Sequence, residues 1–119
     1  MAGTTFSLPI LPFLLILLLC NAGGMIKTAN AQDKTWCVAK PSSTDAELSA
    51  NLEFACGHVD CTTIQPNGPC FNPNTFINHA SVAMNLYYSF HGRNLWNCDY
   101  QKSGLITKTD PSYGTCQYA

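Results

Sequence analysis

Two carboxylates that lie roughly 5 to 9 Å apart, one on each side of a glycosidic bond, hydrolyse that bond. The chain has two glutamates, Glu47 and Glu53. Residues six apart on a helix project about 120° from each other, so this pair does not face a common substrate. Asp45 and Asp110 occupy positions typical of a helix start and of a turn. The carboxylates therefore favour structural roles over a hydrolase.

Nucleophilic, metal and phosphate chemistry also lack a motif. His58, His79 and His91 are spread along the chain, and no Gly-x-Ser-x-Gly elbow or phosphate-binding glycine loop occurs. Cys56 and Cys61 with His58 would hold a metal only if both thiols stayed reduced. We expect no catalytic residue, no metal and no cofactor.

Aromatic rings with uncharged polar neighbours offer binding chemistry instead. No Asp, Glu, Lys or Arg occurs from Thr62 to Gly92, although a solvated helix face normally carries charge. A ring presents an apolar face on which the C–H face of a sugar stacks, while amides and hydroxyls bond sugar hydroxyl groups. Charge would gain little against a neutral ligand and would have to be desolvated. This stretch therefore favours a neutral polysaccharide as the ligand.

The residues expected to bind such a ligand are tyrosines and asparagines on or near the second helix. Tyr88 borders the uncharged polar side of that helix, and Tyr113 lies in a turn. The predicted binding residues are Tyr88, Tyr87, Asn85, Asn78, Tyr113 and Tyr100. Trp36 and Phe76 are expected to fill the core, and Tyr87 also lies on the main apolar face.

The net charge argues against nucleic acid as a partner. After residue 31 the chain has five basic and seven acidic residues, a net charge of −2. Binding to a polyanion draws on a basic patch that releases counterions. We expect no nucleic-acid partner.

An export signal is expected over residues 1–31. Pro9 to Cys20 is an apolar run too short to span a bilayer comfortably, and Ala29-Asn30-Ala31 offers the small residues that signal peptidase accepts. No second apolar run follows, so we expect a secreted monomer of residues 32–119 without membrane insertion or a lipid anchor.

Six cysteines remain after the predicted cleavage: Cys37, Cys56, Cys61, Cys70, Cys98 and Cys116. An even set in a small exported chain predicts three disulfides. Each bridge contributes roughly 2 to 4 kcal/mol, which matters because a core of this size is marginal. Spacing alone does not choose among the possible pairings.

The first elements of the expected domain are a strand and a helix. Residues 36–39 form a strand that ends before Pro41. Thr44 and Glu47 form a capping box at the start of a helix that Gly57 ends. The apolar face of this helix consists of Leu48, Leu52, Ala55 and Cys56.

The second helix is expected to start after Asn72, with Pro73 in its first turn, and to end at Gly92. Apolar residues cover more than half of it: Phe76, Ile77, Ala80, Ala83, Met84, Tyr87, Tyr88 and Phe90. An uncharged wedge of Asn78, Ser81, Asn85 and Ser89 remains for solvent or ligand. Strands are expected at 96–101, 105–107 and 115–118, which gives an α+β fold of two packed helices with a small antiparallel sheet.

Several segments together resemble one known family. They are Trp36-Cys37-Val38-Ala39-Lys40, Ala55-Cys56-Gly57, Asp60-Cys61, the run from Ile64 to Thr75 with Pro69-Cys70-Phe71-Asn72-Pro73-Asn74-Thr75, His79-Ala80-Ser81, Met84-Asn85-Leu86-Tyr87-Tyr88 and Asp110-Pro111-Ser112-Tyr113-Gly114-Thr115-Cys116. From Trp36 to Tyr118 the chain resembles the plant X8 domain, also called carbohydrate-binding module family 43.

The resemblance implies a non-catalytic module that binds β-1,3-glucan, including callose, in the plant cell wall. It also implies that Cys37 pairs with Cys98, Cys56 with Cys61, and Cys70 with Cys116. Members occur attached to β-1,3-glucanases, as lipid-anchored proteins at plasmodesmata and as short secreted proteins, and this chain resembles the last kind. Its expected location is the apoplast or cell wall, with plasmodesmal association as an option.

The turn after the fifth cysteine departs from the family pattern, which usually has a small, Gly-rich turn there. This chain has Asp99-Tyr100-Gln101-Lys102-Ser103-Gly104. If this turn borders the glucan, we expect the affinity or specificity for glucan to differ from that of the relatives. An extracellular protein-interaction module, acting as cofactor of a wall enzyme or receptor, is the alternative hypothesis. A small hydrolase is a third.

Overall fold

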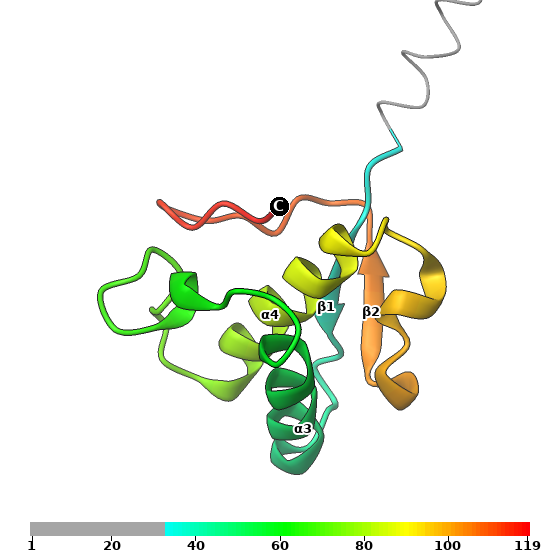
Figure 1. Ribbon diagram of the computed structural model, residues 1–119, viewed down its shortest axis with the longest axis horizontal. Helices are drawn as coiled ribbons and strands as arrows, with labels where there is room; N and C mark the ends of the chain where they lie inside the picture. Colours follow the sequence, from blue (N-terminus) through cyan, green and yellow to red (C-terminus); the bar gives the residue numbers. More distant parts are fainter. Residues whose placement is uncertain (1–32) are drawn as a thin grey trace, which may run out of the picture. The chain divides into compact units, whose positions relative to one another are not determined.

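The computed structural model describes residues 33–119, and Thr35–Ala119 forms one compact unit. The predicted signal peptide lies outside the described residues. The expected class is confirmed: the unit has two α-helices, a two-stranded antiparallel sheet and three disulfides (Figure 1).

The sheet joins the two ends of the domain. Strand β1 is Trp36–Ala39 and strand β2 is Gly104–Thr107, and they pair antiparallel with Cys37 opposite Ile106. Both strands were expected, and Trp36 is buried as predicted. The sheet places the N-terminal strand beside a segment more than sixty residues later in the chain.

Two further strands expected in the C-terminal third are absent from the described residues. Residues 95–98 and 100–102 form 3₁₀ turns, and near the terminus a single bridge joins Tyr113 to Cys116. The physical reason at 96–101 is the backbone, because Tyr100, Gln101 and Lys102 all have positive φ, between 43° and 69°. An extended strand needs negative φ at every residue.

Helix α3 spans Asp45–Cys56 and begins as predicted. The Oγ1 atom of Thr44 accepts from the N–H of Glu47 at 3.1 Å, and the Glu47 carboxylate accepts from the N–H of Thr44 at 2.8 Å. This reciprocal pair satisfies two N–H groups that the helix start would leave free. Gly57 follows the last turn as expected.

Helix α4 spans Phe76–Phe90, so its predicted start at Asn72 is wrong. Thr75 caps the helix because its hydroxyl accepts from the N–H of Asn78 at 3.2 Å. The Asn78 amide in turn donates to the carbonyls of Cys70 and Pro73, which fixes residues 70–75 as an irregular turn.

The C-terminal end of α4 lies close to its prediction. Gly92 has φ +94° and follows the cap residue His91. The N–H of Arg93 donates to the carbonyl of Tyr88 at 2.8 Å, and that of Gly92 to Ser89 at 3.3 Å. These two bonds are a Schellman motif, which needs a left-handed residue at the position of Gly92.

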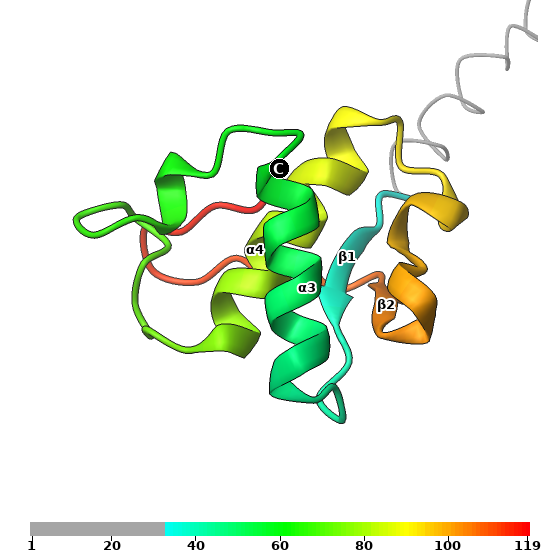
Figure 2. The same cartoon turned by 60° about the horizontal axis from the view of Figure 1, so that its bottom comes forward.

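Helix α4 is the centre of the domain, and it packs against both α3 and β1 (Figure 2). One buried cluster faces the sheet and comprises Cys37, Ala39, Leu48, Ala80, Met84, Tyr88 and Cys98. A second comprises Ala55, Cys61, Ile64, Cys70, Val82, Ala83 and Cys116. The two ends of α4 extend beyond these clusters. Phe76, Ile77 and Phe90 are therefore exposed, whereas they were expected to be buried.

The uncharged wedge of α4 faces inward, which corrects its interpretation as a solvent or ligand face. The Asn85 side-chain oxygen accepts from the N–H of Cys37 at 2.9 Å, and the Ser81 hydroxyl accepts from the N–H of Ala39 at 2.9 Å. Two side chains one helical turn apart thus provide hydrogen-bond acceptors for the backbone N–H groups on the edge of β1 that does not face β2. Charge is missing there because this side of the helix is core.

The three disulfides join Cys37 to Cys98, Cys56 to Cys61 and Cys70 to Cys116. This is the pairing that the resemblance implied. The first bridge ties β1 to the turn before β2, and the third ties the segment before α4 to the C-terminal segment. Each main cluster of the core therefore contains one long-range covalent link.

Between residues 33 and 119, no helix is both long and apolar enough to cross a membrane.

Candidate functional site

Two of the six predicted binding residues lie in the core. Tyr88 and Asn85 are each 1% exposed. The Tyr88 hydroxyl shares a hydrogen bond of 2.6 Å with the Thr35 hydroxyl, and the Arg93 guanidinium lies over its ring. The Asn85 amide nitrogen donates to the carbonyl of Ala119 at 3.1 Å. Neither side chain has surface to offer a ligand, so the expectation that they border an open face is wrong.

Asn78 and Tyr113 are brought together, at the base of the irregular turn before α4. The Tyr113 hydroxyl donates to the carbonyl of Asn72 at 2.6 Å and lies 3.0 Å from the Asn78 side-chain oxygen. The Asn78 nitrogen is also bonded to two backbone carbonyls. The polar groups of both residues are therefore engaged in holding this turn against the C-terminal segment.

The remaining two predicted residues, Tyr87 and Tyr100, line one pocket of about 450 Å³. Helix α3 forms one wall, helix α4 contributes Tyr87, and the 3₁₀ turns after α4 complete the rim. The lining residues are Ala50, Asn51, Phe54, Tyr87, Trp96, Asn97, Asp99, Tyr100 and Gln101. Segments separated by up to fifty residues in the sequence therefore meet here.

Aromatic rings dominate the pocket. Phe54 lies edge-on to Tyr87, with ring centroids 5.0 Å apart, and edge-on to Tyr100 at 6.1 Å. Tyr87 and Tyr100 are also edge-on, at 6.3 Å. Mutual edge-to-face packing holds the three rings at fixed angles. Trp96 also lines the pocket and is 75% exposed, so its indole offers a broad apolar face to solvent.

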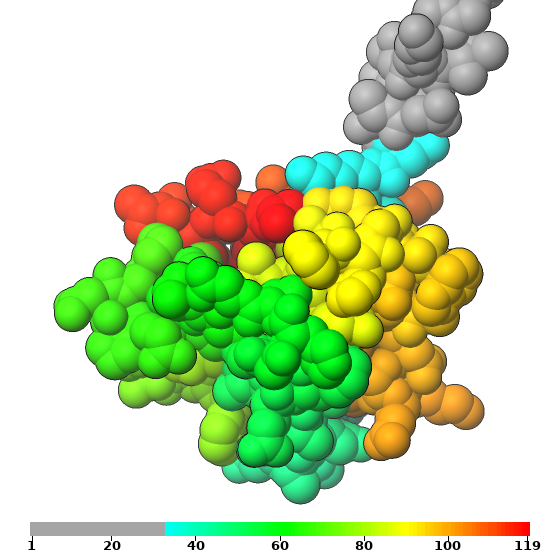
Figure 3. Space-filling view, in the orientation of Figure 1, coloured from blue at the N-terminus to red at the C-terminus, as the bar shows by residue number. Residues whose placement is uncertain are grey.

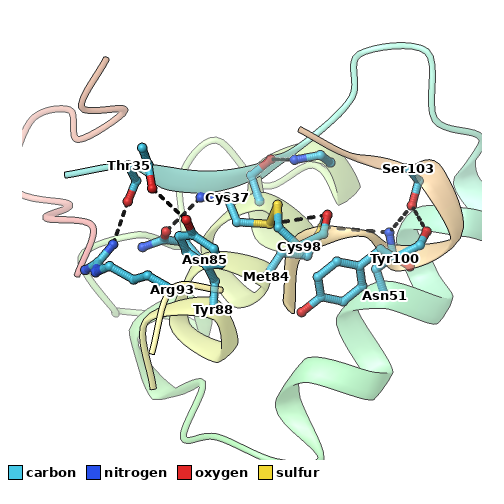
Figure 4. The surroundings of a disulfide bond; sticks show 12 residues. Thr35, Cys37, Asn51, Met84, Asn85, Tyr88, Arg93, Cys98, Tyr100 and Ser103 are labelled. Carbon is cyan, nitrogen blue, oxygen red and sulfur yellow. Dashed lines mark hydrogen bonds between the residues drawn. A yellow bond between two sulfur atoms is a disulfide. The ribbon is translucent and has the colours of Figure 1, made fainter. Parts of the chain in front are cut away.

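The turn that carries Tyr100 is held by a buried polar network, shown in Figure 4. The Asn51 amide donates to the Ser103 hydroxyl at 2.7 Å, and that hydroxyl donates to the carbonyl of Tyr100 at 2.7 Å. The adjacent Cys37–Cys98 disulfide anchors the start of the turn to β1. Tyr100 is thus positioned by contacts to both α3 and the sheet.

Gly104 closes the same turn at very short range. A Cβ atom at this position would lie 1.8 Å from the carbonyl oxygen of Cys98. No other residue type fits without moving the backbone, so glycine is required for the turn to return into β2.

The electrostatics of the pocket suit a neutral ligand. Burial raises the pKa of Tyr100 well above its ordinary value, and the neighbouring Tyr87 raises it further. A phenol with the ordinary pKa of 10.0 is already protonated at physiological pH, and both causes make ionisation of Tyr100 still less favourable. Asp99 is the single charged residue among those that line this pocket.

Phe54 and Trp96 line the pocket but are not among the predicted binding residues. Phe54 lies on the outer side of α3, away from the apolar stripe that includes Leu48, and it is 45% exposed. An aromatic residue off the apolar face of a helix was the available signal, since such a ring is left without core to fill. Trp96 was read as part of a strand, which concealed its exposure.

A second hollow lies on a different side of α3 and contains the ring pair Phe71 and His79, with centroids 5.3 Å apart. The His79 ring is held by a 2.7 Å hydrogen bond to the carbonyl of Phe71. Figure 3 shows the surface over α3 and the loop that follows it. This hollow has fewer aromatic rings, so the aromatic pocket is the stronger candidate.

No metal centre is found among residues 33–119. Cys56 and Cys61, which could hold a metal with His58 only as free thiols, are joined to each other as a disulfide. Their sulfur atoms therefore carry no thiolate for a metal.

Residues 35–105 match the family model of the X8 domain. The chain is similar to the major pollen allergen Ole e 10 of Olea europaea, with 49% identity over 88 residues that cover 72% of each chain. It is also similar to a glucan endo-1,3-beta-D-glucosidase of Olea europaea, with 51% identity over 85 residues, 71% of this chain and 18% of the relative. A Triticum aestivum glucan endo-1,3-beta-glucosidase is 47% identical over 83 residues, 70% of this chain and again 18% of the relative.

The chain therefore spans less than a fifth of each of these two glucosidases but most of the allergen. The matched region includes β1, both helices and the turns that build the aromatic pocket. Since the family model covers more than half of the sequence and the fold carries the expected disulfides, the chain belongs to the X8 domain family.

Proposed function

We propose that this protein is a secreted, non-catalytic module that binds β-1,3-glucan of the callose or laminarin type in the plant cell wall, and that the glucan binds at the aromatic pocket. The observation that carries the proposal is the cluster of Phe54, Tyr87, Trp96 and Tyr100 around one hollow. We infer the β-1,3 linkage of the bound glucan from the names of the glucosidase relatives, which specify this linkage.

The pocket has the two kinds of group that sugar binding needs. Ring faces cover the C–H faces of pyranose rings, and the amides of Asn51, Asn97 and Gln101 lie among them to bond hydroxyl groups. A pocket of about 450 Å³ accommodates a short stretch of a glucan chain. Binding of this kind depends little on ionic strength, because the ligand is uncharged.

The same residues argue against hydrolysis. Cleavage of a glycosidic bond needs two carboxyl groups, and the lining of the pocket contains one, Asp99. Glu47 is committed to the capping box of α3. We therefore propose that the protein binds the glucan without cleaving it.

Secretion to the cell wall is supported by the three disulfides. Bridges of this kind persist in oxidising compartments and are rare in the cytosol. In a domain this small they supply stability that the core alone lacks.

The direct test is calorimetric titration of the oxidised protein with laminarihexaose, with cellohexaose as the linkage control. We expect heat from the first sugar, little from the second, and no shortened product in the mixture. Trp96→Ala should reduce affinity at least tenfold, whereas Phe90→Ala, which removes an equally exposed ring outside the pocket, should leave it unchanged. Equal loss in both variants, or new reducing ends, would contradict the proposal.

A second candidate function is protein interaction, as cofactor of a wall enzyme or receptor. It is favoured by Phe90 and Leu95, which are large apolar side chains exposed by 73% and 69% close to the end of α4. Exposed apolar residues of this kind suit a protein partner. Recovery of a wall protein that depends on Phe90 and not on glucan would support it.

A further inference from the structure

Two polar atoms of residues that line the aromatic pocket are buried without a hydrogen-bond partner among residues 33–119. They are the hydroxyl oxygen of Tyr100 and the side-chain oxygen of Asn97, and both residues line the pocket. An orphaned buried polar group lowers stability, and folded proteins retain few of them. Two within one pocket therefore call for a physical explanation.

Poor packing of the turn does not explain them, because several of its other polar groups are paired. The Ser103 hydroxyl bonds both Asn51 and the carbonyl of Tyr100. The N–H of Asn97 donates to the carbonyl of Asn94 at 2.8 Å. The hydroxyl of Tyr88, buried in the adjacent core, also has a partner at 2.6 Å.

The backbone of the turn carries a second cost at the same place. Tyr100, Gln101 and Lys102 are consecutive non-glycine residues in the left-handed region. Each such residue is disfavoured by roughly 1 to 2 kcal/mol, and strain of this kind gathers at functional sites. The strained turn holds the Tyr100 ring, which lines the pocket, against Phe54 and Tyr87.

We propose that the Tyr100 hydroxyl and the Asn97 side-chain oxygen recognise the bound glucan by forming hydrogen bonds with its hydroxyl groups. This inference rests on the function proposed above and names its specificity-determining atoms. The phenol donates and the amide oxygen accepts, so the pair matches sugar hydroxyl groups, which do both. Ring stacking supplies affinity for any pyranose, whereas these two directional bonds discriminate between linkages. Both atoms are covered by neighbouring groups in the free protein, so the proposal requires that side chains lining the pocket shift when the glucan binds.

Tyr100→Phe tests the inference because it removes one oxygen and keeps the ring. We expect its affinity for laminarihexaose to fall roughly 2- to 12-fold, which corresponds to the loss of one neutral hydrogen bond. The thermal midpoint of the ligand-free variant should equal or exceed that of the wild type, because the removed hydroxyl had no partner to lose. Asn97→Leu, of similar shape, should behave in the same way.

Tyr118→Phe is the matched control, since it removes a half-buried phenol oxygen from a residue outside the pocket and should leave affinity unchanged. Unchanged affinity in both Tyr100→Phe and Asn97→Leu, with a wild type that binds, would overturn this inference and leave the proposed function standing. A lower thermal midpoint for Tyr100→Phe would show that the hydroxyl is bonded in the free protein and would also overturn it. A wild type that binds no laminarihexaose would overturn both.

Discussion

Tyr88 and Tyr100 show how one residue type serves two purposes at neighbouring positions. The Tyr88 hydroxyl is bonded to Thr35 and its ring is enclosed by the core cluster that faces the sheet. The Tyr100 hydroxyl has no such partner, and its ring borders a hollow. At the scale of single residues, the pairing of the hydroxyl therefore separates the structural Tyr88 from Tyr100, the tyrosine proposed to bind the ligand.

The burial of Tyr88 leads to a stability prediction. Tyr88→Ala should lower the free energy of unfolding by about 3 to 5 kcal/mol, because it removes a large enclosed ring. Tyr88→Phe should cost about 0.5 to 1.5 kcal/mol and leave laminarihexaose affinity unchanged, since only the bond to Thr35 is lost. Urea denaturation and calorimetry measure the two quantities. A large loss of affinity in Tyr88→Phe would return this residue to the binding site.

Alkaline pH provides a second prediction at this scale. Burial raises the pKa of both Tyr100 and Tyr118 above the ordinary value of 10.0. An unfolded tyrosine ionises first, so stability is full below pH 10 and falls as pH rises beyond it. The urea midpoint of the wild type should drop above pH 10, and the double variant Tyr100→Phe/Tyr118→Phe should drop less steeply. Parallel curves would contradict the assignment.

At the scale of elements, helix α4 gives β1 the hydrogen-bond partners that a third strand would provide in a larger sheet. Asn85 and Ser81 accept the N–H groups of Cys37 and Ala39 along the outer edge of β1. The two-stranded sheet is thus completed by side chains of a helix. This arrangement lets so small a sheet satisfy its buried backbone.

Removal of these partners should destabilise the whole domain. Asn85→Ala and Ser81→Ala each leave a buried N–H group unpaired, and each should lower the free energy of unfolding by about 1 to 3 kcal/mol. Ser49→Ala, on the exposed side of α3, serves as the control and should change it by less than about 0.5 kcal/mol. Urea titration distinguishes these values. Near-neutral effects at both α4 positions would mean that the strand edge is satisfied in another way.

The turn into β2 gives a further prediction. Gly104→Ala would place a Cβ atom against the Cys98 carbonyl, so the variant should misfold or lose the Cys37–Cys98 bridge. Gly57→Ala should be tolerated, because its φ is −79° and the nearest atom lies 3.3 Å from the added Cβ. Peptide mapping of the oxidised variants checks both outcomes. A native bridge pattern in Gly104→Ala would be contrary to the close approach described here.

The same elements show what could be predicted from the sequence. Thr44 and Glu47 identified the start of α3 because a capping box is local, and the apolar run from Trp36 to Ala39 before Pro41 identified β1. The role of Asn85 was missed because its partner is a strand 48 residues away, which no local pattern reveals. The conformation of the turn at Tyr100 was not predicted, because three left-handed non-glycine residues have no propensity signal. Tyr87 and Tyr100 were predicted as binding residues, but Phe54 and Trp96, which line the same pocket, were not, because Phe54 lies off the apolar face of its helix and Trp96 was expected in a strand.

At the scale of the whole molecule, the disulfides divide the task of stabilisation unequally. Cys37–Cys98 and Cys70–Cys116 close long loops, with separations of 61 and 46 residues, whereas Cys56–Cys61 closes one of 5. Loop-closure entropy therefore assigns about 4 kcal/mol to each long bridge and about 2 kcal/mol to the short one.

Paired substitution of both cysteines by serine tests this ranking. Removal of Cys56–Cys61 should leave a folded protein with a reduced thermal midpoint, while removal of Cys37–Cys98 should abolish cooperative unfolding at ordinary temperature. Calorimetric scans of the oxidised variants provide the measurement. The reverse order would imply that the local bridge holds the loop after α3 in a way that chain entropy does not describe.

The two-stranded sheet has unequal edges, and this bears on behaviour at high concentration. The edge of β1 is occupied by α4, whereas β2 has no strand on its other side within the described part of the chain. An uncovered strand edge is where one molecule adds to another and aggregation begins. Here β2 is four residues long and lies between Lys102 and Lys108, so repeated addition would bring like charges together. Replacing these lysines with neutral residues should therefore shorten the shelf life of a concentrated solution before it changes the folded state.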